Sequence, residues 1–197
     1  MGRPTVYDAD LLLDVAVALA AESPERLTMS AVAAKAGAPS GSVYHRFPNR
    51  PALMGELWLR TVSQFQTGFL GALGAADPVA ARVGAARHVI AWSREHPDEA
   101  GALLHGAAAF DAAAWPAPIA VEADRRATEL ERALDRLATR TPGGSALNRE
   151  LLTFAVIDAP YAVVRRYLRG GSEIPAGAER MIEQCARTLA GTIATDY

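Results

Sequence analysis

The sequence predicts an all-α protein, and three observations support this prediction. Gly and Pro divide the 197-residue chain into stretches whose apolar residues recur at helical spacing. No stretch shows the alternation of polar and β-branched residues that a half-buried strand would have. Half of the residues are apolar and Ala is abundant, which favours helices around a buried core over disorder.

Turn residues separate nine predicted helices, with approximate bounds 8–22, 29–36, 40–46, 50–73, 78–95, 98–110, 117–139, 146–168 and 176–195. The second begins after Thr28, whose hydroxyl can cap a helix, and ends before Gly37, where a left-handed residue is common. The third ends before Pro48, because proline disfavours helical geometry in the residue that precedes it. Two short helices joined by a tight Gly-containing turn predict a helix-turn-helix.

The predicted third helix has an unusual outer face. Val43 and Phe47 share its inner face, which leaves small or polar residues outside or on the flanks: Ser40, Gly41, Ser42, Tyr44 and His45. A solvated face usually carries Lys and Glu, whereas small residues suit a helix that enters a groove. Hydroxyl groups there can donate to phosphates, and His45 can reach base edges. A plain three-helix packing unit is the alternative.

The charge distribution is uneven, although the net charge is only −2. No Asp or Glu occurs from Leu27 to Gly55, while Lys35, Arg46 and Arg50 are present. Such a stretch indicates a surface that faces anions, with a chance gap in acidic residues as the alternative. Arg50 opens the helix at 50–73, where a cation opposes the helix dipole. We therefore expect Arg50 to contact phosphate.

Residues 28–54, TMSAVAAKAGAPSGSVYHRFPNRPALM, resemble the DNA-binding motif of TetR-type transcriptional repressors. That pattern runs Thr, an apolar helix, Ala-Gly, a short turn, Gly, Ser or Thr, an aliphatic residue, Tyr, two basic or His positions, Phe, then Lys or Arg. The resemblance implies phosphate contacts from Thr28, Tyr44 and Arg50. It implies that four residues face the major groove: Ser40, Gly41, Ser42 and His45. The sequence departs from the pattern at Pro39, where a capping Ser is usual.

The resemblance also implies a DNA-binding domain at 1–50 and a helical ligand-binding and dimerisation domain at 51–197. The protein would be a homodimer whose recognition helices, at about 40–46, read a double-stranded DNA operator ~34 Å apart. An unknown small-molecule effector would change that spacing, so we expect a ligand-responsive repressor. Repression is the family default, and the residues leave activation, the operator and the effector open. The alternative is a non-specific helical DNA-binding or adaptor protein without an inducer.

Two C-terminal helices are the predicted dimer interface. The helix at 146–168 is apolar almost all round from Leu151 to Val164, so it needs burial on most sides. The helix at 176–195 has one apolar face. Two copies of each would form a four-helix bundle across a twofold axis, whereas packing within one subunit is the alternative.

An anomaly in the 146–168 helix leads to the candidate ligand residues. Asp158 lies on an apolar arc, where a carboxylate needs a partner, and Pro160 cannot donate to the carbonyl of Val156, so the helix should bend. A bent helix could line a cavity, and an ion pair with Arg is the alternative for Asp158. The candidate ligand-binding residues are His88, Trp92, Leu104, Phe110, Trp115, Phe154, Asp158 and Tyr161. Core packing is the alternative for the aromatic residues among them.

Several classes of protein are excluded or not indicated. Cys185 is the single cysteine, which excludes an internal disulfide and a Cys-based zinc site and fits a reducing cytoplasm. No apolar window is long enough for a membrane span, and the N-terminus lacks the features of a signal peptide. The sequence contains no evident nucleophile with a base, metal-ligand set or Gly-rich phosphate loop. We therefore expect a cytoplasmic protein that is no enzyme and holds no metal or cofactor.

Overall fold

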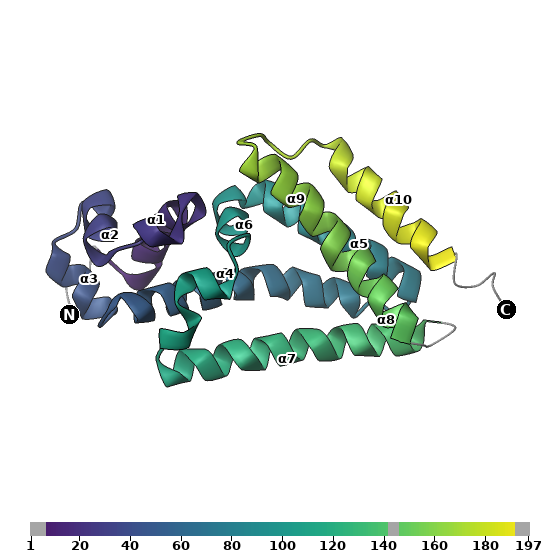
Figure 1. The fold of residues 1–197 in the computed structure, drawn as a ribbon, viewed down its shortest axis with the longest axis horizontal. Coiled ribbons are helices and arrows are strands. Elements are labelled where there is room, and N and C mark those ends of the chain that lie inside the picture. The colour runs from purple at the N-terminus through teal and green to yellow at the C-terminus, as the bar shows by residue number, and fades with distance from the viewer. Residues whose placement is uncertain (1–6, 142–145, 192–197) are drawn as a thin grey trace, which may run out of the picture. The chain divides into compact units, whose positions relative to one another are not determined.

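The computed structural model describes residues 7–141 and 146–191, and this part of the chain contains helices and no strand (Figure 1). The predicted all-α class is confirmed. The α-helices are α1 (Ala9–Glu22), α2 (Met29–Ala36), α3 (Ser40–Arg46), α4 (Arg50–Leu73), α5 (Pro78–Glu95), α6 (Pro97–Leu103), α7 (Ala117–Arg140), α8 (Ala146–Thr153), α9 (Ala159–Arg169) and α10 (Gly177–Gly191). Three short 3-10 helices, η1 (Pro24–Arg26), η2 (Ala107–Phe110) and η3 (Ala112–Ala114), and a π-helical segment, η4 (Phe154–Asp158), complete the described elements. No described helix combines the length and the apolar character that a bilayer crossing requires.

The helix predicted at 98–110 is wrong beyond Leu103. There the chain forms η2 and η3, Gly106 has a positive φ of 77°, and Asp111 is left-handed (φ 55°). Within the described residues, Asp111 is the one non-Gly residue with positive φ. Left-handed geometry cannot continue an α-helix, and Asp is among the few side chains that tolerate it.

The helix predicted at 146–168 is interrupted where Pro160 was expected to disturb it. The N–H of Ala159 donates to the carbonyl of Phe154, five residues back, which defines the π-helical turn of η4. Pro160 lacks an N–H, so the regular ladder cannot continue through it. The last helix begins at Gly177, and the residues predicted to end it, 192–195, lie outside the described part.

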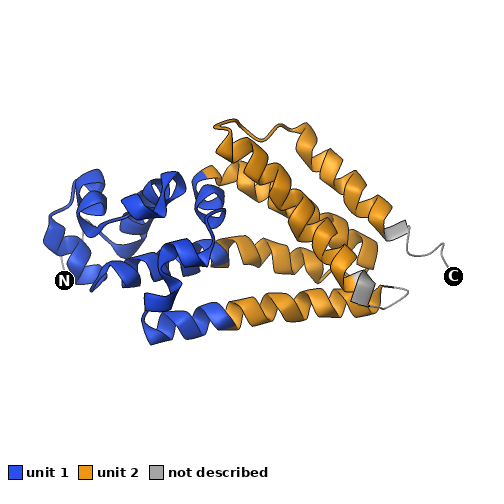
Figure 2. Cartoon of the chain, in the orientation of Figure 1, with its two compact units in different colours: residues 1–62, 98–124 blue, residues 63–97, 125–197 orange. Residues whose placement is uncertain are grey.

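Packing divides the chain into two compact units (Figure 2). Unit 1 consists of residues 1–62 and 98–124, and unit 2 consists of residues 63–97 and 125–197. Unit 1 therefore contains α1 to α3 and also the segment that holds η2 and η3. The division into a DNA-binding domain at 1–50 and a second domain at 51–197 stays a prediction.

Unit 1 has one core that joins helices far apart in the sequence. Leu12, Leu27, Val43 and Leu57 are fully buried in it together with Phe110, which lies in η2. In unit 2, α5 is buried on most sides and packs against α10, α9 and η4. Three of the buried apolar residues of α5 are Ala, which lets neighbouring helices approach it closely at these positions.

Candidate nucleic-acid interface and ligand site

Local capping holds the helix-turn-helix in place as the sequence predicts. The Thr28 hydroxyl accepts a hydrogen bond from the N–H of Ala31 at 3.1 Å, which caps α2. Gly37 is left-handed (φ 64°) at the end of α2. The Tyr7 hydroxyl donates to the Gly37 carbonyl at 2.8 Å, a contact that the sequence did not predict. This bond links the turn between α2 and α3 to the residue just before the N-cap of α1.

The structure brings the predicted recognition residues together on one face of α3. Val43 and Phe47 are buried in the core of unit 1, as expected. Ser40, Gly41, Tyr44 and His45 are exposed, with Tyr44 at 56%, whereas Ser42 and Thr28 are half-buried. A Cβ atom added at Gly41 would meet nothing within 4 Å, and the φ of Gly41 is not positive. The fold therefore does not require glycine there, although glycine costs a helix up to about 1 kcal/mol relative to Ala.

Arg50 does not extend from the surface, which changes the interpretation of this residue. Its Nε donates to the carbonyl of Leu27 at 2.7 Å, and its Nη2 donates to the carbonyl of Pro24 at 3.1 Å. Its Nη1 forms an ion pair with Asp111. All three guanidinium nitrogens are therefore engaged within unit 1, where they connect α4 with η1 and the η2–η3 segment. This arrangement favours a structural role for Arg50, and its phosphate contact stays a prediction.

The start of α4 explains how a cation can stand at its first position. The Asn49 side chain accepts from the N–H of Ala52 at 2.9 Å and so caps the helix. The guanidinium of Arg50 reaches carbonyl oxygens of other segments instead of remaining beside the N–H groups of this first turn. The unfavourable dipole interaction is thus offset by the bonds that Arg50 makes.

Comparisons with known proteins agree with this geometry. Residues 12–57 match the model of bacterial regulatory proteins of the tetR family. Residues 12–57 are therefore a TetR-type domain. This TetR-type domain contains α2 and α3, whose arrangement is described above. A search of curated proteins found no match.

Solved structures resemble the chain over nearly its whole length. A TetR-like transcriptional regulator from Rhodococcus sp. RHA1 is 20% identical, with 96% of this chain and 100% of that chain covered and a TM-score of 0.73. The ketosteroid transcriptional regulator KstR2 of Mycobacterium tuberculosis is 19% identical, with 94% and 95% covered and a TM-score of 0.71. FadR from Bacillus subtilis, in complex with stearoyl-CoA, is 12% identical, with 96% and 100% covered and a TM-score of 0.65. At these identities the likeness shows a shared fold.

Three predicted ligand residues, Leu104, Phe110 and Trp115, lie buried in unit 1. The indole N–H of Trp115 donates to the carbonyl of Phe110 at 2.7 Å. Trp58 packs on both rings, with centroid distances of 5.3 Å to Phe110 and 6.3 Å to Trp115. Phe110 and Trp115 belong to the same core cluster as the α2 and α3 residues. The structure thus favours core packing within unit 1 for these aromatic residues.

His88 and Trp92 form an aromatic group with α4 in unit 2. Phe65 lies 5.4 Å from the His88 ring and 5.3 Å from the Trp92 ring, centroid to centroid. The His88 Nε2 lies 2.9 Å from the Phe65 carbonyl and can donate to it. Burial lowers the pKa of His88, while the bond to Phe65 and the charge of Glu95 oppose this shift. The contact of His88 and Trp92 with a ligand stays a prediction.

The last three predicted ligand residues are exposed in the described chain. Phe154 is 47% and Tyr161 39% exposed, and Asp158 also lies at the surface. The expectation that Asp158 is buried beside a partner is therefore wrong. A π-helical turn contains more residues than an α-turn, so a regular helical wheel misplaces Asp158 at the end of η4. A solvated carboxylate needs no ion pair.

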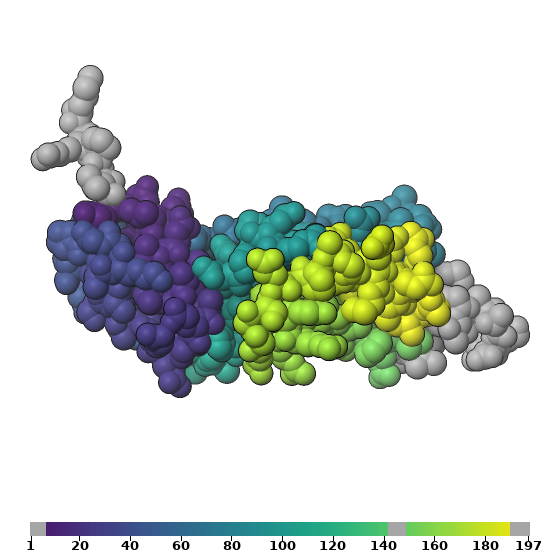
Figure 3. Space-filling model, turned by 90° about the horizontal axis from the view of Figure 1, so that it is seen from above, coloured from purple at the N-terminus to yellow at the C-terminus, as the bar shows by residue number. Residues whose placement is uncertain are grey.

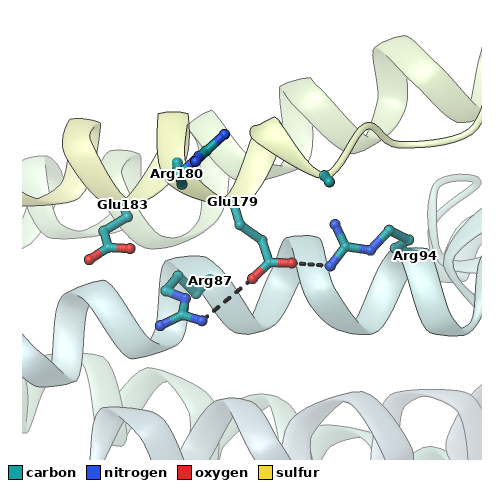
Figure 4. Close-up of a pocket in the computed structure, with 6 residues that line it drawn as sticks. Arg87, Arg94, Glu179, Arg180 and Glu183 are labelled. Atoms are coloured by element: carbon teal, nitrogen blue, oxygen red, sulfur yellow. Dashed lines mark hydrogen bonds and ion pairs between the residues drawn. The ribbon is translucent and has the colours of Figure 1, made fainter.

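A surface pocket of about 440 Å³ lies between α5 and α10 in unit 2 (Figure 4). Its lining residues are Arg87, Arg94, Ala176, Glu179, Arg180 and Glu183. Figure 4 shows the Glu179 carboxylate between Arg87 and Arg94, with an ion pair to each. Glu183 pairs with Arg187 at 2.8 Å, and this hydrogen bond lowers the pKa of Glu183. The two ion pairs of Glu179 connect α10 to α5, whereas the Glu183–Arg187 pair lies within α10.

Arg82 is a residue that the sequence analysis missed. It is 5% exposed and is the one charged residue in the buried class of the described residues. Its buried Nε has no hydrogen-bond partner, and Arg82 forms no ion pair with any residue that the structure describes. Burial lowers the pKa of Arg82, and the charge of Asp77 opposes this shift. The signal in the sequence was an Arg on the same helix face as Ala86 and Val89, four and seven residues further on.

Proposed function

We propose that this protein is a ligand-responsive transcriptional repressor that binds a double-stranded DNA operator as a homodimer through α3. The exposed face of α3 in the TetR-type domain is the observation that carries this proposal. Packing does not require glycine at position 41 of that face, whereas insertion of α3 into a DNA groove would explain it. Small side chains let the helix backbone approach the base pairs.

The recognition residues divide into two roles. The hydroxyl groups of Ser40, Ser42 and Tyr44 donate to phosphates, and the hydroxyl of Thr28 can still donate while its oxygen caps α2. His45 reads base edges in the major groove. Arg50 positions this surface from behind, because its three nitrogens bind within unit 1.

The exposed apolar side chains of unit 2 support the homodimer. Phe154 and Tyr161 lie near the junction of α8, η4 and α9, and Met181 of α10 is 54% exposed. In the space-filling view, α9 and α10 form an open face of unit 2 (Figure 3). A second copy that covers α8, α9 and α10 would remove these side chains from water and complete a four-helix bundle. Such a dimer holds its recognition helices ~34 Å apart.

Unit 2 is the proposed effector domain. FadR from Bacillus subtilis has the same fold and was solved in complex with stearoyl-CoA, which supports a small-molecule site in this fold. An effector releases DNA only through its higher affinity for the DNA-free shape, and a tenfold effect corresponds to ~1.4 kcal/mol of coupling. Such a regulator acts in the cytoplasm, where Cys185 stays reduced.

The proposal is tested by selecting genomic fragments that the purified protein binds, with the region upstream of its own gene included. Fluorescence anisotropy then compares each selected duplex with a scrambled one over several salt concentrations. We expect a cognate duplex to bind ~10³-fold or more tightly than its scrambled form. Equal affinity for both would favour the non-specific binder instead. If no fragment binds even at low salt, the proposed function is wrong.

A further inference from the structure

Arg82 is an exception among the arginines of unit 2 that are withdrawn from solvent. Arg94 pairs with Glu179, and Arg149 binds Glu131 and Asp135. Arg82 is buried, yet its Nε has no hydrogen-bond partner and it forms no ion pair in the described part of the chain. An unpaired buried cation is costly, so proteins normally pair such a group or neutralise it.

The surroundings of Arg82 do not remove this cost. Arg82 lies one turn into α5, and the buried residues Ala86, Val89 and Ser93 follow it on the same helix face. α5 packs against η4 and α9, whose buried residues are apolar. The carboxylate of Asp77 is exposed and accepts from the N–H of Ala80, and it forms no ion pair with Arg82.

We propose that Arg82 is the anchor for an acidic group, a carboxylate or a phosphate, of a small molecule that binds in unit 2. A guanidinium presents paired N–H donors that match the two oxygens of such a group. The bound anion would supply the negative charge that no described side chain brings into an ion pair with Arg82, so the site would select acids over neutral molecules of the same shape. The description of this acid as the effector rests on the proposed function, whereas its binding to Arg82 does not.

The first test needs no ligand and uses Arg82→Met, with Arg136→Met at an exposed arginine of α7 as the matched control. Methionine keeps most of the volume of Arg and removes the charge. Because the guanidinium is unpaired, we expect Arg82→Met to raise the Tm by about 2 °C or more. A lower Tm for Arg82→Met than for the control would mean that Arg82 stabilises the fold, and it would overturn the proposal.

The second test uses a panel of aliphatic and aromatic carboxylates and phosphate monoesters, each paired with the neutral amide or alcohol of the same skeleton. Thermal shift ranks the panel on the wild-type protein, and calorimetry measures the hits. We expect at least one acid to bind more tightly than its neutral counterpart and to lose about 30-fold or more in affinity on Arg82→Met. Arg136→Met should bind it as the wild type does. A panel without such an acid, or equal binding to Arg82→Met, would refute the anchor.

DNA binding of the same proteins separates this proposal from the proposed function. With a cognate duplex, the acid should release the wild-type protein and leave Arg82→Met bound. If the wild type binds no DNA while acid binding still depends on Arg82, the repressor proposal fails and the anion site stands. If DNA binding is specific but Arg82→Met binds the acid normally, the repressor proposal stands and the anchor is wrong.

Discussion

Replacing Arg50 with Met should destabilise the TetR-type domain without removing a phosphate contact. The ion pair with Asp111 contributes less than about 1 kcal/mol, because the Arg50 side chain is 33% exposed and solvent screens it. The two bonds to the carbonyls of Leu27 and Pro24 are partly buried and contribute about 1 kcal/mol each, or somewhat more for a charged donor. A loss of about 2–4 kcal/mol lowers the Tm of a protein of this size by roughly 5–12 °C.

Two measurements on Arg50→Met separate a positioning role from a phosphate contact. A residue that binds phosphate lowers the salt dependence of DNA affinity by about one unit of log K against log salt when it is removed. A positioning residue weakens DNA binding and leaves that slope unchanged. We therefore expect a lower Tm, weaker binding to cognate DNA and an unaltered slope, measured by anisotropy well below the Tm of the variant.

Asp111→Asn is the graded control for this prediction. Asn also tolerates the left-handed backbone at this position, so the substitution removes the ion pair and keeps the turn. It should lower the free energy of unfolding by less than about 1 kcal/mol, well below the effect of Arg50→Met. An unchanged Tm for Arg50→Met together with a slope reduced by one unit would show that Arg50 binds phosphate after all.

Three further predictions concern packing, titration and recognition. Gly55→Ala should lower the free energy of unfolding measured in urea, because the new Cβ would lie 2.7 Å from an α7 side-chain atom. Gly71→Ala, where a Cβ meets open space, should raise that free energy by up to about 1 kcal/mol, and a rise in both variants would contradict the packing account. Burial lowers the pKa of His88, so the stability that its neutral form contributes is present above pH ~6.5 and is lost as the pH falls toward the folded-state pKa. The Tm should therefore fall more steeply from pH 7.5 to 5.5 in the wild type than in His88→Gln, and parallel curves for the two proteins would disprove this prediction. In anisotropy titrations Tyr44→Phe should weaken cognate and scrambled duplexes alike, while His45→Ala should also change base preference, and equal losses for His45→Ala would rule out base reading.

The helix-turn-helix was predictable because its signals are local. Thr28 caps α2 through the N–H three residues ahead, and Gly37 ends the same helix with its own φ. Pro48 follows α3 within two residues. Each of these residues sets a helix end within about one turn of itself, so the helix bounds can be predicted from neighbouring residues alone. The bounds predicted for 29–36, 40–46 and 50–73 agree with α2, α3 and α4.

The roles of single side chains depended on long-range partners and were less predictable. Arg50 and Asp111 are 61 residues apart in the sequence, and no periodicity links them. The prediction that Asp158 lies on a buried helix face assumed a regular α-helix, in which successive residues are rotated by about 100°. This rotation does not hold across the π-helical turn of η4. The burial of Arg82 was likewise hidden, because an Arg on a helix usually reaches solvent. The surroundings of Arg50, Asp158 and Arg82 depend on which helix faces pack together in the folded chain.

The TetR-type domain also shows why a sequence motif is shorter than the unit that folds. The family model ends at residue 57, within α4. The core beneath α2 and α3 nevertheless includes Phe110 and Trp115, which come from a later segment of unit 1. Without that segment, this core would lose Phe110 and Trp115, and Arg50 would lose its carboxylate partner. The exposed face of α3 is therefore encoded locally, whereas the core that supports it also depends on side chains from residues 98–124.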